Sequence, residues 1–286
     1  MEPSLQLCTA LRYYAQGGFL PVIGDLHGIS DRAASRAIHS VSEIICEKID
    51  TFISWPDDDE IRLSKRKFYE TTHGMSQILG AIDGTHVPLI APCAPSNEMA
   101  FVNRKGYHSI NTQILCSHDL KIFDIDARWP GSSHDSFILR NSTVAQKFEN
   151  EMSDTWILGD SGYPLTRWLL IPVRNPTTRA EERFNSVHMH ARSCVERCNG
   201  VLKMRWRCLT KPVMFRPERA ARIIVACGAL HNFALKHRMP FPEESNDPYQ
   251  FNDNFNTYEF ENPNNSALSV RQTLIQNLYG VSSQYD

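Results

Sequence analysis

Apolar residues recur at helical spacing through the first fifty positions. The pattern predicts helices over 3–20, over Leu20–Leu26 and from Asp31 to about Ile49, with Ser30 or Asp31 as the cap of the third. A short helix, a turn around Gly28 and a longer helix are typical of a helix-turn-helix unit. We therefore expect a DNA-binding module over residues 1–50. Its exposed face would present four polar side chains to a groove, namely Arg32, Ser35, Arg36 and His39.

From residue 78 onward, short apolar runs replace the early helical pattern. They predict strands over 78–91, 109–116, 121–128, 155–158 and 168–173, the second and third forming a hairpin. Helical periodicity follows over 133–148, 179–209 and 216–238. This order predicts an α/β domain over 78–238, a mixed sheet with helices on its faces. Residues 51–77 are polar and are expected to form a linker with one helix near 64–69.

The last segment, 239–286, differs from the rest in charge. It contains seven acidic residues and one basic residue, whereas the preceding part has 29 basic and 25 acidic residues. We expect this tail to be mostly disordered, with a short helix over 266–279. A mildly basic body with an acidic tail is compatible with a polyanionic partner such as DNA, but does not establish one.

Composition narrows the class of protein further. An apolar content of 42% is typical of a folded globular chain. No apolar run approaches the roughly 18 residues that a membrane span needs, so no membrane partner is expected. The start of the chain lacks the pattern of a secretory signal. The eight cysteines are scattered, mostly within apolar stretches, which favours free thiols over a disulfide framework.

Three carboxylates stand at positions where the elements could bring them together. Asp83 and Asp160 each follow a short apolar run, and Glu196 lies in a helical stretch. Asp135, at the start of the 133–148 helix, is a fourth candidate. Clustered carboxylates bind hard divalent cations such as Mg²⁺ or Mn²⁺, which can promote phosphoryl displacement. The set predicts a metal-dependent phosphodiester site with Asp83, Asp160 and Glu196 as its catalytic residues.

Each acid taken alone has an ordinary alternative. Asp83 and Asp160 precede glycine or a turn and could simply be turn residues, and Asp135 could be an acid at a helix N-terminus. Glu196 could be a solvated helix residue. The set favours a site only because strand order, spacing and helix position agree.

Several motifs, in order along the chain, resemble the PIF/Harbinger transposases and the nucleases derived from them in animals. The resemblance covers about residues 5–238 and rests on the blocks 83–86, 103–111, 129–136, 158–164, 184–185, 195–197, 200–203 and 230–232. It implies an RNase H-like fold with the acidic triad Asp83, Asp160 and Glu196 on two divalent metal ions. Asp135 would be an additional metal-binding acid. The resemblance also implies DNA as substrate, a Myb-like partner protein, and a location in the nucleus and also the cytoplasm. Self-association into a homo-oligomer is a further expectation.

Other residues leave alternatives open. Arg104 and Lys105 could contact DNA phosphates or lie in a solvated loop. Cys194 and Cys198 lack a matching Cys/His pair at finger spacing, which disfavours zinc. Two rival functions also remain. One is a DNA-binding or adaptor protein that keeps the transposase fold without catalysis, and the other is a regulatory protein acting through the acidic tail.

Overall fold

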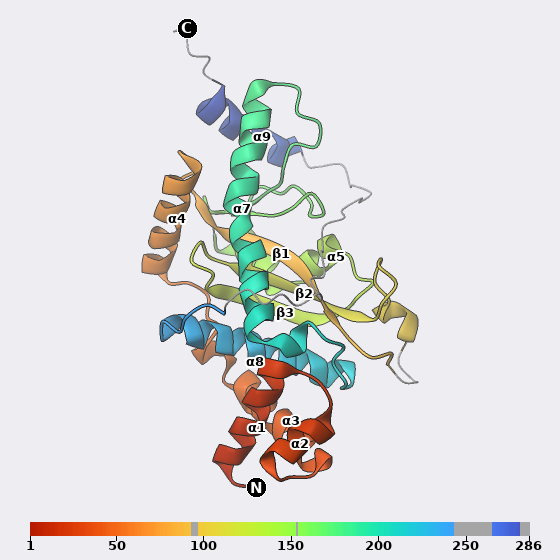
Figure 1. Cartoon of the computed structure of the whole chain (residues 1–286). Coiled ribbons are helices and arrows are strands. Elements are labelled where there is room, and N and C mark those ends of the chain that lie inside the picture. The colour runs from red at the N-terminus through yellow and green to blue at the C-terminus, as the bar shows by residue number, and fades with distance from the viewer. Residues whose placement is uncertain (93–96, 153, 243–264, 281–286) are drawn as a thin grey trace.

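A five-stranded mixed sheet forms the centre of the protein, in the order β3-β2-β1-β4-β5. The computed structural model describes residues 1–92, 97–152, 154–242 and 265–280 (Figure 1). The antiparallel part joins β1, β2 and β3, and the parallel part joins β1, β4 and β5. The strands are β1 (Ile78–Pro88), β2 (Ser109–Cys116), β3 (Ile122–Pro130), β4 (Trp156–Leu158) and β5 (Leu169–Leu170).

Helices cover both faces of this sheet and enclose two hydrophobic cores. They are α4 (Asp58–Thr72), α5 (Asp135–Arg140), α6 (Thr143–Asn150), α7 (Arg179–Arg205) and α8 (Pro217–Lys236). The larger core joins the sheet to α7, α8 and the N-terminal helices, and the smaller joins the opposite face to α6. Neighbouring strand residues divide between the cores, as Ile78 lies in the larger and Leu79 in the smaller. Alternation along β1 therefore positions its polar residues on both faces as well.

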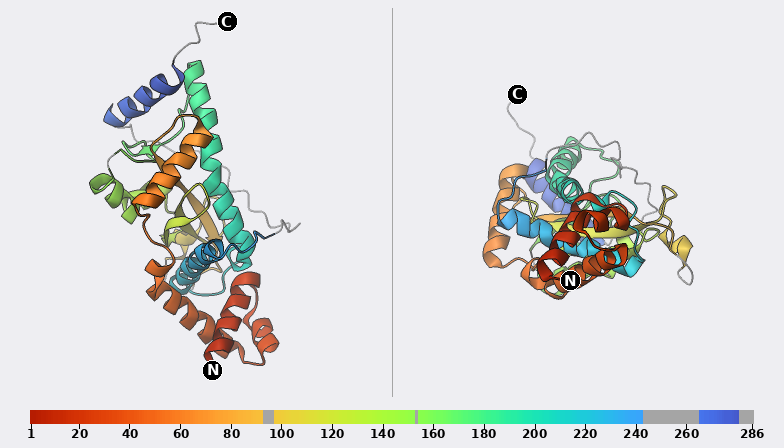
Figure 2. Two further views of the ribbon diagram at one scale, coloured as in Figure 1. Left: turned by 90° about the vertical axis from the view of Figure 1, so that its left-hand side faces the viewer. Right: turned by 60° about the horizontal axis from the view of Figure 1, so that its bottom comes forward.

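The N-terminal helices form a separate group at one end of the molecule (Figure 2). They are α1 (Pro3–Gln16), α2 (Leu20–His27) and α3 (Asp31–Glu47). The turn between α2 and α3 packs directly against Gly24, where a Cβ would lie only 2.5 Å from the Ile29 carbonyl oxygen. Only glycine leaves room for this approach. Gly28 ends α2 with a positive φ, and the Ser30 hydroxyl caps α3 by accepting from Ala33 N. Gly28 and Ser30 thus fix where α2 ends and where α3 begins.

The observed elements differ in places from those expected. The helix expected over 133–148 is two helices, because Ser142 caps α6 and starts a new helix there. Helix α4 is longer than 64–69, because Asp57 caps it and the acids at 58–60 form its first turn. Strand β5 has only two residues, and Pro172 follows closely. Helix α7 ends at Arg205, and a 3-10 turn, η3, follows over Arg207–Leu209.

At the start of the outer strand β3, a side chain caps the backbone of Ile122. Asn232 on α8 accepts from Ile122 N at 2.9 Å and donates to Ile122 O at 2.7 Å. The amide thereby reproduces the pairing that a further strand would make. Capping of this kind protects an edge strand from pairing with another chain.

Within the acidic tail, α9 (Asn265–Tyr279) packs back onto the domain. It buries Ala267 and Ile275, and Arg271 donates to the carbonyl oxygens of Ile171 and Pro172 at 3.2 and 3.1 Å. Most of the segment expected to be disordered, 243–264, lies outside the described residues. None of the helices that the structure describes is long and apolar enough to cross a membrane.

Candidate active site

Strands β1 and β4 bring two of the acids next to each other, with Asp83 inside the central strand β1 and Asp160 two residues after the end of β4. The strands are parallel neighbours, with Ala81 opposite Leu158, so Asp83 and Asp160 follow at corresponding positions. The Asp160 side chain is fixed by accepting from Gly162 N at 2.9 Å, and the residue is buried. Asp160 thus lies just beyond the carboxyl end of β4, which is the kind of position where ligands bind in open α/β sheets.

The fourth acid, Asp135, approaches β1 from the N-terminus of α5. A Cβ on Gly84 would lie 2.5 Å from Asp135 Oδ1 and 3.1 Å from Asn111 Oδ1, so both side chains use the space that glycine leaves open. Asn111 on β2 holds Asp135 in place, since its Nδ2 donates to Asp135 Oδ1 at 2.9 Å and to Ser133 O at 3.0 Å. Gly84, next to Asp83, therefore allows the Asp135 carboxylate to reach β1.

Helix α7 contributes the third acid as part of a polar stripe. The spacing of Arg192, Glu196, Asn199 and Lys203 places them on one face of the helix. Arg192 pairs with Glu196 and lies 3.5 Å from Asp83 Oδ1. Asn199 Nδ2 donates to Asp83 Oδ2 at 3.4 Å, and Lys203 Nζ donates to His86 O at 3.0 Å. The stripe thus faces strand β1 along the segment that carries Asp83.

Electrostatics show that the four acids share one neighbourhood. Burial raises the pKa of Asp83 well above its usual value, and Asp160, Asp135 and Glu196 raise it further. The Arg192 guanidinium acts in the opposite direction and lowers the pKa of Asp83. A half-buried carboxylate that interacts with three others is costly to ionise unless a cation compensates it. The site therefore favours positive charge.

The donors present fit a hard divalent cation by their chemistry, since they are carboxylate and amide oxygens. Two amide oxygens beside the acids, Asn111 Oδ1 and Asn199 Oδ1, are buried and have no hydrogen-bond partner within the described structure. A cation or its water ligands would satisfy such orphaned acceptors. No three His, Cys, Asp or Glu side chains among the described residues are already drawn together as a ligand set. The residues therefore fit the metal by type and neighbourhood, and closing the ligand set would require side chains to move.

The remaining expected site residues lie in two places. Arg104, in an exposed turn, contacts His134 Nδ1 at 2.7 Å, which brings it next to Asp135. Lys105 is exposed in the same turn. On α3, Arg32 and Arg36 are exposed and Ser35 is half-buried, while His39 pairs with Glu43 at 3.2 Å. The structure thus brings Arg104 to the acids and leaves the α3 residues with the N-terminal helices.

Sequence reasoning assigned no role to Arg192, Asn111 or Asn199. A signal was available for two of them, because Arg192 and Asn199 share a helical face with Glu196 at spacings of four and three. Asn111 lies on another strand, and its contact with Asp135 spans 24 positions. That contact depends on strand register, which local pattern does not specify.

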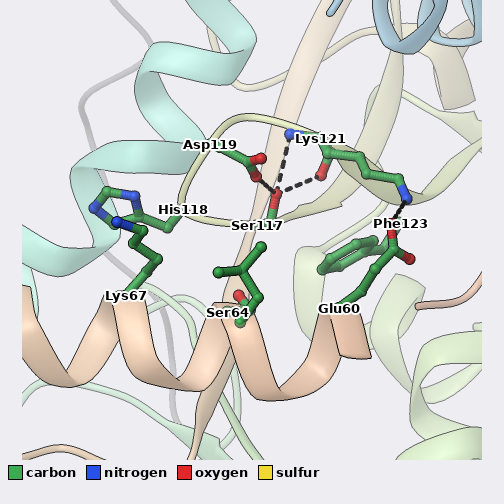
Figure 3. A pocket seen from close by; sticks show the side chains of 9 residues that line it. Glu60, Ser64, Lys67, Ser117, His118, Asp119, Lys121 and Phe123 are labelled. Atoms are coloured by element: carbon green, nitrogen blue, oxygen red, sulfur yellow. Dashed lines mark hydrogen bonds and ion pairs between the residues drawn. The ribbon is translucent and has the colours of Figure 1, made fainter. Parts of the chain in front are cut away.

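Two other features, a pair of cysteines on α7 and a pocket beside α4, take no part in the acidic site. Cys194 and Cys198 are buried free thiols, and they belong to no metal-binding group among the described residues. The pocket lies between α4 and the β2–β3 turn (Figure 3). There Lys121 pairs with Glu60, and the Ser117 hydroxyl accepts from Lys121 N. Both lysines that line it are already paired, Lys67 with Glu70 and Lys121 with Glu60, so we assign this pocket no part in the site.

The chain is similar to known proteins over most of its length. Residues 82–232 match the family model described as DDE superfamily endonuclease. A Rattus norvegicus protein named "Putative nuclease HARBI1" is 37% identical over 244 residues, which cover 84% of this chain and 69% of that protein. Its Mus musculus counterpart is 35% identical over 285 residues, 96% of this chain and 80% of that protein.

The similarity extends to plants. The Arabidopsis thaliana "Protein ALP1-like" is 33% identical over 249 residues, 80% of this chain and 60% of that protein. No solved structure matches the chain at a significant level. The matched segment includes all four acids and both buried asparagines of the site. The chain therefore belongs to the DDE superfamily endonucleases, the group that contains the nucleases derived from Harbinger transposases.

Proposed function

We propose that this protein is a divalent-metal-dependent endonuclease of transposase type that hydrolyses DNA phosphodiester bonds. One observation carries the proposal: in a DDE-family chain, the acids gather around β1. Asp135 reaches the strand at Gly84 beside Asp83, Asp160 follows the strand paired with β1, and Glu196 is bonded to Arg192, which lies 3.5 Å from Asp83 Oδ1. Strand order, with α7 against β1, supports an RNase H-like arrangement of these acids.

The side chains would divide the work by position. Asp83, within β1, and Asp160, just after β4, would hold the metal ions, Glu196 would complete the site from α7, and Asp135 would add a further carboxylate. When bound, Mg²⁺ or Mn²⁺ would neutralise phosphate charge and favour in-line displacement at phosphorus. Arg104 and Lys105 would position the DNA backbone beside the acids. In strand transfer, a DNA 3′-hydroxyl would replace water as the attacking group.

DNA binding would begin at the N-terminal helices. The exposed Arg32 and Arg36 on α3 suit phosphate or base contacts in a groove, with Ser35 beside them. His39 would contribute less, because it is engaged with Glu43. We propose a helix-turn-helix role for α2 and α3, a nuclear location that gives access to DNA, and assembly with a Myb-like partner or a second copy.

The alternative function is a DNA-binding or adaptor protein that has kept the fold without catalysis. The observation that favours it is Arg192, whose charge already compensates Asp83 and Glu196. The presence of all four acids argues for catalysis instead.

Cleavage of supercoiled plasmid by the full chain separates these functions. In Mg²⁺ or Mn²⁺ we expect conversion to the nicked form, and in EDTA we expect none. DNA binding of equal strength in all three conditions, with no nicking in any, would favour the adaptor.

A further inference from the structure

Arg192 stands between two acids of the proposed triad. Its guanidinium hydrogen-bonds Glu196 Oε1 one turn along α7, and its Nη1 lies 3.5 Å from Asp83 Oδ1 on β1. The Arg192 side chain is only 15% exposed, so it cannot be regarded as a solvated surface group. In this structure the positive charge that bridges strand and helix comes from the protein itself.

The two halves of this bridge differ in character. Arg192 Nη1 is buried and has no hydrogen-bond partner within the described residues, so its attraction to Asp83 is Coulombic without a directed bond. A contact held by charge alone can be replaced by another cation at the same place. Glu196, by contrast, is hydrogen-bonded to Arg192 and remains 48% exposed. Arg192 therefore draws Glu196 to itself, and a carboxylate engaged in this way is less available to a metal ion.

We propose that Arg192 is an exchangeable counter-ion, which compensates Asp83 and Glu196 and gives up both carboxylates when a divalent cation binds. The inference rests on the proposed function, since it assumes that the cation binds at these acids. It accounts for two observations together. The acids lie close enough to interact electrostatically, yet the described side chains are not drawn together as a ligand set. Release of the guanidinium would free Glu196 to close that set.

Competition between the guanidinium and the cation has a measurable consequence. Removing the arginine charge should tighten cation binding, because the cation no longer displaces or approaches a like charge. A residue with a purely structural role would have the opposite effect, since its loss would loosen α7 and weaken binding. Activity alone would not separate these roles, so affinity is the appropriate readout.

The test is calorimetric titration of the full chain with Mn²⁺, comparing Arg192→Gln with wild type. Arg197→Gln is the matched control, because it removes the same charge from an exposed position on the same helix. We expect Arg192→Gln to bind Mn²⁺ roughly tenfold or more tightly than wild type, and Arg197→Gln to stay within about twofold. In EDTA, Arg192→Gln should also melt at a lower temperature, because two acids lose their counter-ion.

Each outcome decides the inference. Equal or weaker Mn²⁺ binding by Arg192→Gln would overturn the exchange. The proposed function would stand in that case, provided that Asp160→Asn binds Mn²⁺ more weakly than wild type. If neither wild type nor any variant binds Mn²⁺, the metal chemistry of the proposed function fails and the exchange fails with it. Should Arg192→Gln not fold, Arg192→Lys replaces it. Its single ammonium cannot fork between two carboxylates, so its affinity should rise by a smaller factor, and a fall would refute the exchange.

Discussion

At the scale of single residues, Gly84 decides how closely two acids can approach. Its missing side chain leaves room for Asp135 Oδ1, which would lie 2.5 Å from a Cβ at this position. The obstructing atom is the end of a side chain, so the fold can absorb the clash by moving Asp135. The position of the acid, rather than the stability of the strand, is therefore what glycine protects.

We predict that Gly84→Ala lowers cleavage roughly tenfold to a hundredfold by displacing Asp135, while unfolding free energy falls by only about 1 kcal/mol. Rates on plasmid DNA and urea unfolding measure the two effects. Gly200→Ala is the control, because a Cβ at Gly200 meets no atom within 4 Å and alanine suits its helix. Full activity of Gly84→Ala would show that Asp135 takes no part.

His188 gives the fold a dependence on pH that is separate from the acids. It is buried on α7, its Nε2 donates to Leu170 O at 2.9 Å, and burial lowers its pKa from 6.5 to about 4. Below pH 6.5 the unfolded chain therefore takes up a proton that the folded chain refuses. Stability from this histidine is complete above pH 6.5 and is lost as the pH falls toward 4.

We predict that this proton uptake removes up to about 3 kcal/mol of unfolding free energy between pH 6.5 and 4. Denaturant unfolding across that range should show a shallower loss in His188→Gln, which keeps a donor for Leu170 O. His190→Gln, exposed on the same helix, should retain the wild-type slope. Identical slopes in all three proteins would mean that His188 is protonated in the fold.

At the scale of elements, helix α7 connects stability to the site. It begins with a capping box, in which Glu181 N donates to Thr178 Oγ1 at 3.2 Å and Thr178 N donates to Glu181 Oε2 at 3.1 Å. The same helix presents Arg192 and Glu196 to β1. Loosening the first turn of α7 should therefore lower the stability of the fold more than it changes the cation affinity of the acids.

We predict that Thr178→Ala lowers the unfolding free energy by about 1 kcal/mol. Mn²⁺ affinity should remain near wild type, since the site lies several turns further along α7. Ser186→Ala, at an exposed mid-helix position, should cost little because alanine favours helix. Chemical denaturation of the three proteins measures this, and an unchanged midpoint for Thr178→Ala would mean that the cap contributes nothing.

The elements that carry the candidate acids could largely be predicted from sequence, because each depends on local pattern. A short apolar run before Asp160 indicates a strand that ends there, and helical periodicity places Glu196 on a helix. The run before Asp83 also indicates a strand, but β1 continues past Asp83 to Pro88 instead of turning there. The length of α4 was missed because its first-turn acids look like a polar linker. The role of Asn111 was missed because it depends on which strands pair and in what register.

At the scale of the whole molecule, the N-terminal helices α1–α3 lie at one end, away from the sheet (Figure 1). Helix α3 presents exposed arginines, whereas the acids lie around β1 on the side that faces α7. A nuclease built this way would bind DNA through the helices and cut it at the sheet. Affinity and cleavage should therefore be separable by mutation.

We predict that Arg36→Ala weakens DNA binding and lowers the salt dependence of log affinity by about one unit if its phosphate contact is lost. Mn²⁺ affinity should not change, because α3 is remote from the acids. Arg66→Ala on the exposed face of α4 is the charge-matched control. DNA titrations at several salt concentrations measure the slope, and equal slopes for Arg36→Ala and wild type would remove α3 from the interface.

If the acids gathered around β1 cut DNA, removing one of their carboxylates must stop cleavage. The most direct measurement is the rate of Mg²⁺- or Mn²⁺-dependent plasmid nicking by Asp160→Asn, beside wild type and the exposed control Asp154→Asn. We expect the nicking rate of Asp160→Asn to fall roughly a hundredfold or more while its DNA binding is retained. The nicking rate of Asp154→Asn should equal that of wild type. Nicking at the wild-type rate by Asp160→Asn would contradict this role of the acids.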